Sequence, residues 1–172
     1  MSIAVYCGSF DPLHIGHLTF IKETLNSHLV KRIIVVPTKD YWNKKVHSTV
    51  EERLETINSL GIEDVITDIR YSEFNYTYEL MRQVQIDYPS ETLFLMLGAD
   101  NLKNLNKWRN FEELLNYHLI IMKRDEFDIV SLMKQLNSEN YTILDCDKVD
   151  VSSTYIRNNK EKAEHLLAKP QK

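Results

Sequence analysis

Two histidines near the amino terminus have the spacing of a phosphate site. His14 and His17 are three residues apart at the predicted start of a helix, so both imidazoles are expected on one helix face. The first turn of a helix offers unpaired N–H groups and the positive end of the helix dipole, which attract anions. Gly16, between them, is expected to leave room for a ligand. A helix cap plus a surface histidine is the simpler alternative for either histidine alone, but it explains the whole string 7–17 less well.

A second anion site is predicted near the carboxyl terminus. The string Ser152-Ser153-Thr154-Tyr155-Ile156-Arg157 contains a candidate serine cap and an arginine one turn later. Serine hydroxyls, helical N–H groups and a forked guanidinium all suit phosphate oxygens. The four glycines of the chain are too widely spaced for a GxGxxG turn or a GxxxxGK[ST] loop. We therefore expect the two strings to bind one triphosphate together, without a glycine-rich loop.

Composition excludes several classes of protein. The chain has 172 residues, with 21 basic and 25 acidic side chains and a net charge of −4, which argues against a strongly basic nucleic-acid surface. Its two cysteines form neither a metal knuckle nor a disulfide framework. Neither a signal peptide nor an apolar run of about 18 residues is visible. The expectation is a cytoplasmic protein with no membrane segment.

Strand-like and helix-like segments alternate along the chain. Strands are predicted at 3–6, 33–36, 65–67, 93–97, 119–122 and 141–144, and helices at 17–28, 49–60, 77–88, 128–136 and about 152–168. This alternation predicts a single α/β domain over 1–172, with a mostly parallel sheet and helices on both faces. Ligands bind outside the carboxyl ends of such strands. Polar stretches 8–17, 38–47, 98–108 and 145–157 follow strands directly and are the candidate site segments.

Both terminal strings resemble the signatures of one enzyme superfamily. Residues 7–17 are similar to the GGxFDPxHxGH signature of the HxGH nucleotidyltransferases, and residues 152–157 match the late SSTxxR of the same group. The resemblance implies a Rossmann-like α/β fold, with the carboxyl-terminal helical segment completing the ATP site. Proteins of this group transfer a nucleotidyl group by positioning the reactants and neutralising phosphate charge.

The middle of the chain resembles one branch of that superfamily. Residues 98–108 are similar to the GADxLxxLxxW stretch of nicotinate-nucleotide adenylyltransferases, and Tyr76-Thr77 resembles their YTxxTL segment. Residues 43–45 and 52–54 resemble their PHK…RLxML region. His14 counts against the phosphopantetheine branch, which usually carries threonine at that place.

The resemblance implies an activity and a set of residues. The reaction joins nicotinate mononucleotide to the AMP moiety of ATP, releases pyrophosphate and uses Mg²⁺ held by the ATP phosphates. The implied catalytic residues are His14, His17 and Arg157. The implied ATP-binding residues are Gly8, Ser9, Phe10, His14, His17, Gly98, Asp100, Ser153, Thr154 and Arg157. The implied mononucleotide-binding residues are Ser9, Phe10, Lys44, Tyr76, Thr77 and Trp108.

Alternatives remain open at three of these residues and for the function. Trp108 is either a platform for the pyridine ring or a core side chain, and Thr77 is either a donor to the nicotinate carboxylate or a simple N-cap. Lys44 is either a phosphate ligand or a solvated loop lysine, and Lys45 is the alternative phosphate ligand. The alternative functions are a transferase for nicotinamide mononucleotide or another phosphorylated acceptor, and a non-catalytic nucleotide sensor. Expected partners are ATP and the mononucleotide, without nucleic acid or membrane; a homodimer is compatible with the sequence.

Overall fold

The computed structural model describes residues 1–39 and 48–146. Its strands are β1 (Ser2–Gly8), β2 (Arg32–Pro37), β3 (Val65–Ile66), β4 (Thr92–Gly98), β5 (His118–Met122) and β6 (Tyr141–Leu144). Its α-helices are α1 (Ile15–Asn26), α2 (Val50–Ser59), α3 (Thr77–Asp87), α4 (Ala99–Asn104), α5 (Phe111–Leu114) and α6 (Ile129–Gln135), with 3-10 turns η1 (Ile69–Glu73) and η2 (Leu105–Lys107). The predicted helical segment at about 152–168 lies outside the described residues.

The six described strands form one parallel sheet, in the order β3-β2-β1-β4-β5-β6. The order runs outward in both directions from β1, so the switch point lies between β1 and β4. The register pairs Gly8 with Pro37 and Gly98 with Met122. The carboxyl ends of four adjacent strands therefore meet at one edge, where an open parallel sheet binds its ligands. The predicted α/β fold with a mostly parallel sheet is confirmed.

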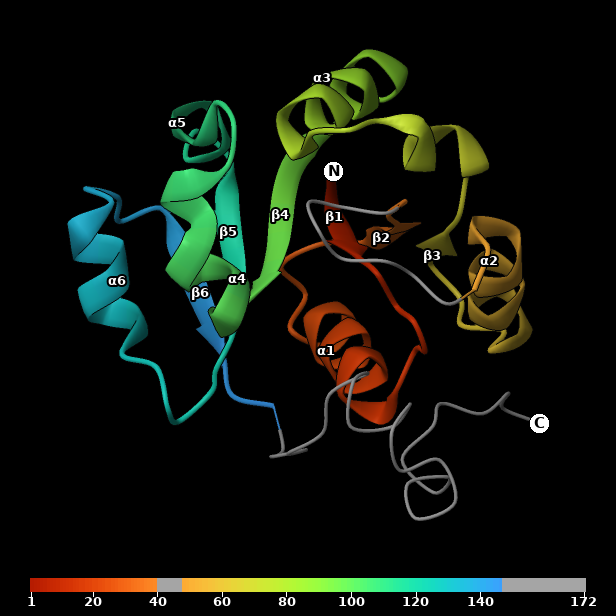
Figure 1. Cartoon of the computed structure of the whole chain (residues 1–172), viewed down its shortest axis with the longest axis horizontal. Helices are drawn as coiled ribbons and strands as arrows, with labels where there is room; N and C mark the ends of the chain where they lie inside the picture. The colour runs from red at the N-terminus through yellow and green to blue at the C-terminus, as the bar shows by residue number, and fades with distance from the viewer. Residues whose placement is uncertain (40–47, 147–172) are drawn as a thin grey trace.

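Each face of the sheet is covered by helices. Alternate residues of β1 point to opposite faces: Ile3 and Val5 pack into a core with α3, α4 and α6, whereas Ala4 and Tyr6 pack into a second core with α1 and the end of α2. Figure 1 shows α1 and α6 on opposite sides of the strands, with α2 beside β3. Because β1 is buried on both faces, the segment that follows it starts from a strand that is held on both sides by packing.

Most element predictions are confirmed. The predicted capping box of α2 is present, since the Thr49 side chain accepts from the Glu52 N–H and the Glu52 side chain accepts from the Thr49 N–H. Gly61, just past this helix, has the left-handed φ of +61° expected of a C-terminal glycine. The sequence did not predict α4, α5 or the two 3-10 turns. These elements are short and have no readable helical period. Buried side chains hold them in the core: Tyr71 in η1, Leu102 in α4, Leu105 in η2 and Leu114 in α5.

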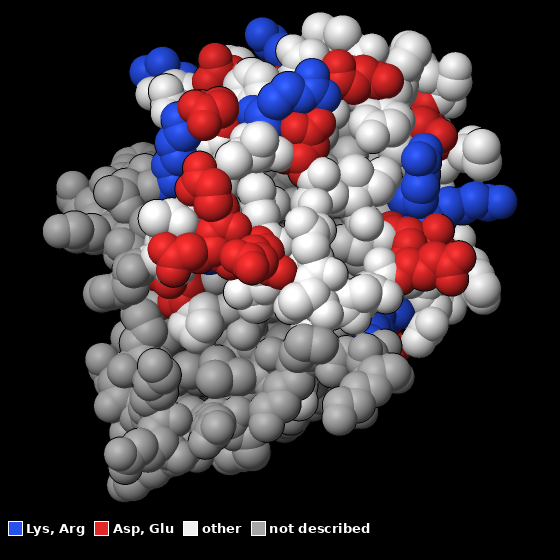
Figure 2. All heavy atoms as spheres, turned by 90° about the vertical axis from the view of Figure 1, so that its right-hand side faces the viewer, with Lys and Arg blue, Asp and Glu red and all other residues white. Residues whose placement is uncertain are grey.

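Several acidic side chains are exposed on α2. Figure 2 shows the side of the molecule that carries α2, with several acidic groups on it. Glu51, Glu52 and Glu55 of α2 are exposed. A surface of this charge repels phosphate. None of the helices in the described part of the chain combines the length and the apolar character that crossing a membrane requires.

Candidate active site

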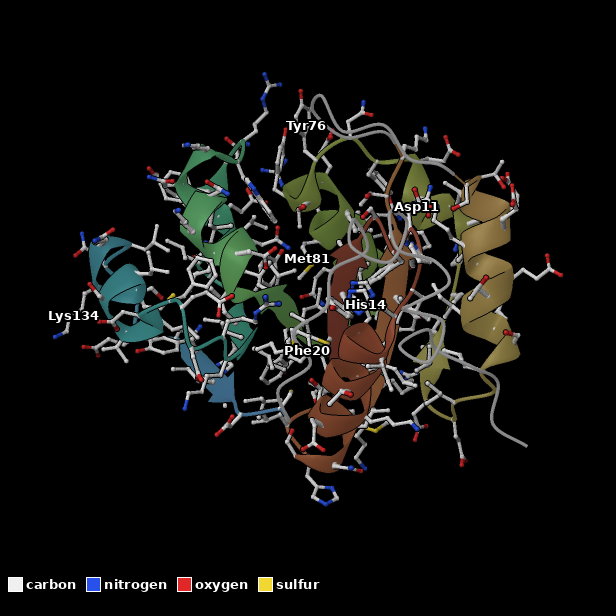
Figure 3. The ribbon with its side chains drawn as sticks, turned by 60° about the horizontal axis from the view of Figure 1, so that its bottom comes forward. Asp11, His14, Phe20, Tyr76, Met81 and Lys134 are labelled. Atoms are coloured by element: carbon white, nitrogen blue, oxygen red, sulfur yellow. The ribbon has the colours of Figure 1, made fainter. Side chains whose placement is uncertain are left out.

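The turn between β1 and α1 lies at the switch point of the sheet. It begins at Gly8, whose carbonyl accepts a 2.9 Å hydrogen bond from the Thr38 N–H at the end of β2. Figure 3 brings this lower side of the molecule forward and shows His14 between Asp11 and Phe20, with Tyr76 and Lys134 farther away. The turn and the residues around it form the candidate site.

His14 and His17 form a stacked pair at the start of α1. His14 is the N-cap, and its Nδ1 accepts from the Gly16 N–H at 3.1 Å. The His14 N–H in turn donates to Nδ1 of His17 at 3.1 Å. The two rings lie 3.7 Å apart between centroids and only 19° from parallel. The prediction that both imidazoles share one helix face is confirmed, and the alternative of a helix cap also describes His14, since this residue performs both roles.

These hydrogen bonds fix the tautomer of both rings. An Nδ1 atom that accepts from a backbone N–H carries no proton, so each neutral imidazole carries its proton on Nε2. Burial, and secondarily the positive charge of Arg124, lowers the pKa of His14 to about 4. Two positive charges on rings 3.7 Å apart would also repel each other strongly. At neutral pH the pair therefore includes a neutral His14 that can donate through Nε2–H.

Three glycines of the site make room for neighbouring side chains. A Cβ on Gly16 would lie 2.9 Å from Cε1 of His14, and one on Gly98 would lie 2.6 Å from an oxygen of Asp100. A Cβ on Gly8 would lie 3.0 Å from the ring of Phe10. The expectation that Gly16 leaves room for a ligand is therefore wrong in its detail. The space belongs to the His14 ring, and the glycine lets that ring fold back onto its own helix.

The side chain of Phe10 is occupied by packing against neighbouring rings. The residue is 2% exposed and has a left-handed φ of +48°. Its ring meets the His17 ring edge-on at 4.9 Å and the Tyr6 ring at 5.1 Å. Phe10 therefore supports one catalytic candidate directly. Ser9 precedes it and is half-buried.

This region contains three polar residues that were not predicted as site residues: Asp11, Ser48 and Arg53. Asp11, which is buried, accepts a 2.6 Å hydrogen bond from the Ser48 hydroxyl. Arg53, on α2, is only 3% exposed and donates to backbone carbonyls of the turn and its surroundings. A sequence signal existed for Arg53: it shares a helix face with Ile57 and Leu60, both of which are buried. A charged residue on an apolar face indicates a buried polar contact.

Asp100 stands at the carboxyl end of the strand beside β1. It lies in the first turn of α4, is exposed, and directly follows the β4 end at Gly98. Burial and the negative charge of Asp100 both raise the pKa of the Tyr6 hydroxyl, which places the carboxylate within electrostatic reach of β1. The predicted position of Asp100 at a strand end is therefore correct.

The second part of the candidate site contains the predicted residues Tyr76, Thr77 and Trp108. The guanidinium carbon of Arg109 lies 4.6 Å from the centre of the Tyr76 ring, so the Trp108–Arg109 turn rests against the start of α3. Tyr76 is the N-cap of α3 and Thr77 its first residue, so the alternative that made Thr77 the N-cap is wrong. Trp108 is half-buried and packs against the core, while Lys107 and Arg109 are exposed. Trp108 thus has both a core side and a surface side.

Arg124 is a cation that the sequence analysis missed. It follows β5, whose end pairs with the end of β4, and it forms a 3.0 Å ion pair with Glu126. Its charge contributes to the lowered pKa of His14, so it lies near the histidine pair. The other predicted cations and caps, Lys44, Ser153, Thr154 and Arg157, lie outside the described residues.

Comparisons with known proteins agree with this architecture. The model of the cytidylyltransferase-like family matches residues 5–159. A probable nicotinate-nucleotide adenylyltransferase of Fusobacterium nucleatum is 32% identical, over 98% of this chain and 94% of the relative. One from Flavobacterium psychrophilum is 31% identical, over 92% of this chain and 86% of the relative.

A solved structure shows the same fold. The nicotinic acid mononucleotide adenylyltransferase of Plasmodium falciparum, complexed with NaAD, superposes with a TM-score of 0.80. Sequence identity is 22%, and the match covers 96% of this chain and 90% of that one. Taken with the family match and the two bacterial relatives, this chain belongs to the cytidylyltransferase-like family and, within it, to the nicotinate-nucleotide adenylyltransferases.

Proposed function

We propose that the chain performs the reaction of its family, with the histidine pair of α1 as the centre of the site. A 5′-phosphate oxygen of nicotinate mononucleotide attacks the α-phosphorus of ATP. The bond from that phosphorus to the bridging oxygen breaks, and pyrophosphate leaves. The observation that carries this proposal is the pair itself: two stacked imidazoles whose Nδ1 atoms are held by backbone N–H groups, at the switch point of a parallel sheet.

The fixed tautomers suit the histidines to phosphate. Each Nε2–H can donate to a phosphate oxygen, and because the ring is already oriented, no reorganisation is needed when charge develops in the transition state. A neutral donor binds phosphate through its hydrogen bond rather than through a full positive charge. The neutralising charge would come from Arg124, from Arg157 and from the metal that accompanies ATP.

Mg²⁺ fits this site as a partner of the nucleotide. Mg²⁺ is usually bound by one or two protein carboxylates together with substrate phosphates and water. Within residues 1–39 and 48–146, no three His, Cys, Asp or Glu side chains are grouped as ligands for a metal. When bound, Mg²⁺ would neutralise part of the triphosphate charge. Asp100, an exposed carboxylate in the first turn of α4, would accept from the ATP ribose hydroxyls.

The second part of the site would take the mononucleotide. Trp108 would stack on the pyridine ring, and the N–H of Thr77, in the first turn of α3, would donate to the ring carboxylate. Ser9 and Phe10 would donate to the 5′-phosphate, together with Lys44. Serine and arginine at 153 and 157 would bind the β- and γ-phosphates of ATP.

The test is a pyrophosphate-release assay with the full chain, ATP and Mg²⁺. Separate reactions receive nicotinate mononucleotide, nicotinamide mononucleotide, phosphopantetheine or no acceptor. The proposal expects release that depends on the acceptor and is fastest with the acid. Faster release with the amide would reassign the acceptor. ATP binding by calorimetry without release from any acceptor would replace the enzyme by a nucleotide sensor.

A further inference from the structure

Arg53 joins three separate segments of the site edge. A single nitrogen, Nη1, donates to the carbonyl oxygens of Ser9 and Thr38, each at 2.6 Å, and Nε donates to the carbonyl of Thr49 at 3.2 Å. These carbonyls belong to the turn after β1, the segment after β2 and the cap of α2. Burying a guanidinium is costly unless its donors are satisfied, so three backbone acceptors are a specific arrangement rather than incidental contact.

The bond to Ser9 has a consequence on the opposite side of the same peptide unit. The Ser9 carbonyl and the Phe10 N–H belong to one planar trans amide, so they point in opposite directions. Because Arg53 holds the carbonyl toward α2, the Phe10 N–H must point away from α2. Hydrogen bonding of a charged donor to the carbonyl also polarises the amide and makes that N–H a stronger donor.

A second connection runs through the Phe10 side chain. The left-handed φ of Phe10 is unfavourable for a residue with a side chain and is maintained only where the surroundings determine it. In this conformation the ring contacts His17 edge-on at 4.9 Å. The Ser9–Phe10 peptide therefore sets both an N–H donor and the packing of a catalytic ring, and Arg53 sets that peptide.

We infer that Arg53 is a positioning residue of the transfer reaction, which orients the Ser9–Phe10 peptide so that its N–H meets the 5′-phosphate of the acceptor. This inference rests on the proposed function. It assigns to Arg53 a role in acceptor binding that acts through the backbone, distinct from a general contribution to folding.

The experiment compares Arg53→Met and Arg53→Lys with a matched arginine elsewhere. Arg32 lies at the start of β2, at the end of the strand opposite to the site edge. It pairs with Glu91 at 3.1 Å, and its guanidinium lies over the Tyr88 ring. Arg32→Met therefore removes an arginine with an ion pair and packing but without contact to the site edge. For each variant, the melting temperature, the folded fraction, kcat, the KM of both substrates and the Kd of ATP by calorimetry are measured.

The inference expects Arg53→Met to raise the KM of nicotinate mononucleotide about tenfold or more, while the Kd of ATP changes less than about twofold. Arg53→Lys, which keeps the charge but loses the fork, should recover part of the loss. Arg32→Met should lower the melting temperature and leave both KM values unchanged. If Arg53→Met does not fold, the KM of Arg53→Lys decides the question.

Two failures are distinguishable. An Arg53 variant that loses kcat in proportion to its folded fraction, with the acceptor KM of the wild type, would overturn the positioning role and leave the proposed function intact. A wild-type chain that releases no pyrophosphate with any mononucleotide would overturn the proposed function, and the role of Arg53 in acceptor binding with it.

Discussion

The two parts of the site are built in opposite ways. In the turn after β1, the histidine side chains bond to backbone N–H groups, and Arg53 binds the carbonyl of the peptide between Ser9 and Phe10. In the second part, α3 and α5 each begin at an N-cap residue whose side chain makes no capping hydrogen bond among the described residues. The helices there leave their first N–H groups to water or to a ligand.

This difference suits the two tasks of a nucleotidyl transfer. In the proposed reaction, the histidine turn would act on charge that develops only in the transition state, so its donors gain most from being fixed beforehand. The second part of the site would recognise a ring and its substituent, for which unsatisfied backbone donors and a half-buried aromatic surface are sufficient. Substitutions in the first region should therefore reduce turnover, and those in the second should weaken acceptor binding.

The largest expected effect is that of His17→Ala. Removing one oriented donor to the transferring phosphate should lower kcat by roughly 10²–10³, or about 2.7–4 kcal/mol of transition-state stabilisation. Steady-state pyrophosphate release measures the change. The matched control is His28→Asn, because His28 is exposed beyond the other end of α1 and has a left-handed φ of 62° that asparagine tolerates. Near-normal turnover in His17→Ala would remove this residue from the mechanism.

A second effect concerns stability at acid pH. Folding lowers the pKa of His14 from 6.5 to about 4, so between these values the unfolded chain binds more protons than the folded one. The contribution of a neutral, buried His14 is complete above about pH 6.5 and is lost as the pH falls toward 4. Between pH 7 and pH 4.5 the free energy of unfolding should decrease by on the order of 2 kcal/mol from this residue alone.

Urea denaturation of wild type and His14→Asn at the two pH values measures this contribution. Asparagine can still cap α1 but does not titrate. The variant should therefore lose less stability than wild type on acidification. Equal losses would show that the pKa of His14 is not lowered in the folded state. The reason for expecting a neutral ring at the phosphate site would then be removed.

Gly16→Ala should have an intermediate effect. The new Cβ would lie 2.9 Å from Cε1 of His14, so the ring must rotate away and lose its bond to the Gly16 N–H. We expect kcat to fall roughly tenfold, the low end of what overpacking costs. Gly61→Ala is the contrasting variant: its Cβ meets no atom within 4 Å, but its φ is +61°. That variant should lose roughly 1 kcal/mol of stability and keep its turnover, whereas loss of turnover in both would point to a general effect on folding.

The sequence predicts the turn after β1, here called the fixed region, better than the second part of the site, here called the open region. The spacing of His14 and His17 and the capping box at Thr49 are local patterns, and local hydrogen bonds bear them out. What Gly16 makes room for was not readable, because the answer depends on the rotamer of a neighbouring ring. Arg53 was missed as a site residue because its partners are distant in sequence: 44 residues separate it from Ser9. Arg124 was missed because its electrostatic effect on His14 joins segments that are far apart in the sequence. Helix α4 was missed because packing at Leu102, rather than periodicity, stabilises its six residues.

The smallest effect should be found at Trp108, in the open region. Trp108→Leu keeps an apolar contact with the core but removes the ring face, and stacking contributes about 0.5–1.5 kcal/mol beyond burial. The KM of nicotinate mononucleotide should rise about 2–10-fold while kcat stays near the wild-type value, and Trp108→Phe should restore most of the affinity. Because stacking does not distinguish a carboxylate from an amide on the ring, the KM of nicotinamide mononucleotide should rise by the same factor. A fall in kcat instead would mean that Trp108, like the histidine turn, contributes to the transition state. The division between a fixed and an open region would then fail at this residue.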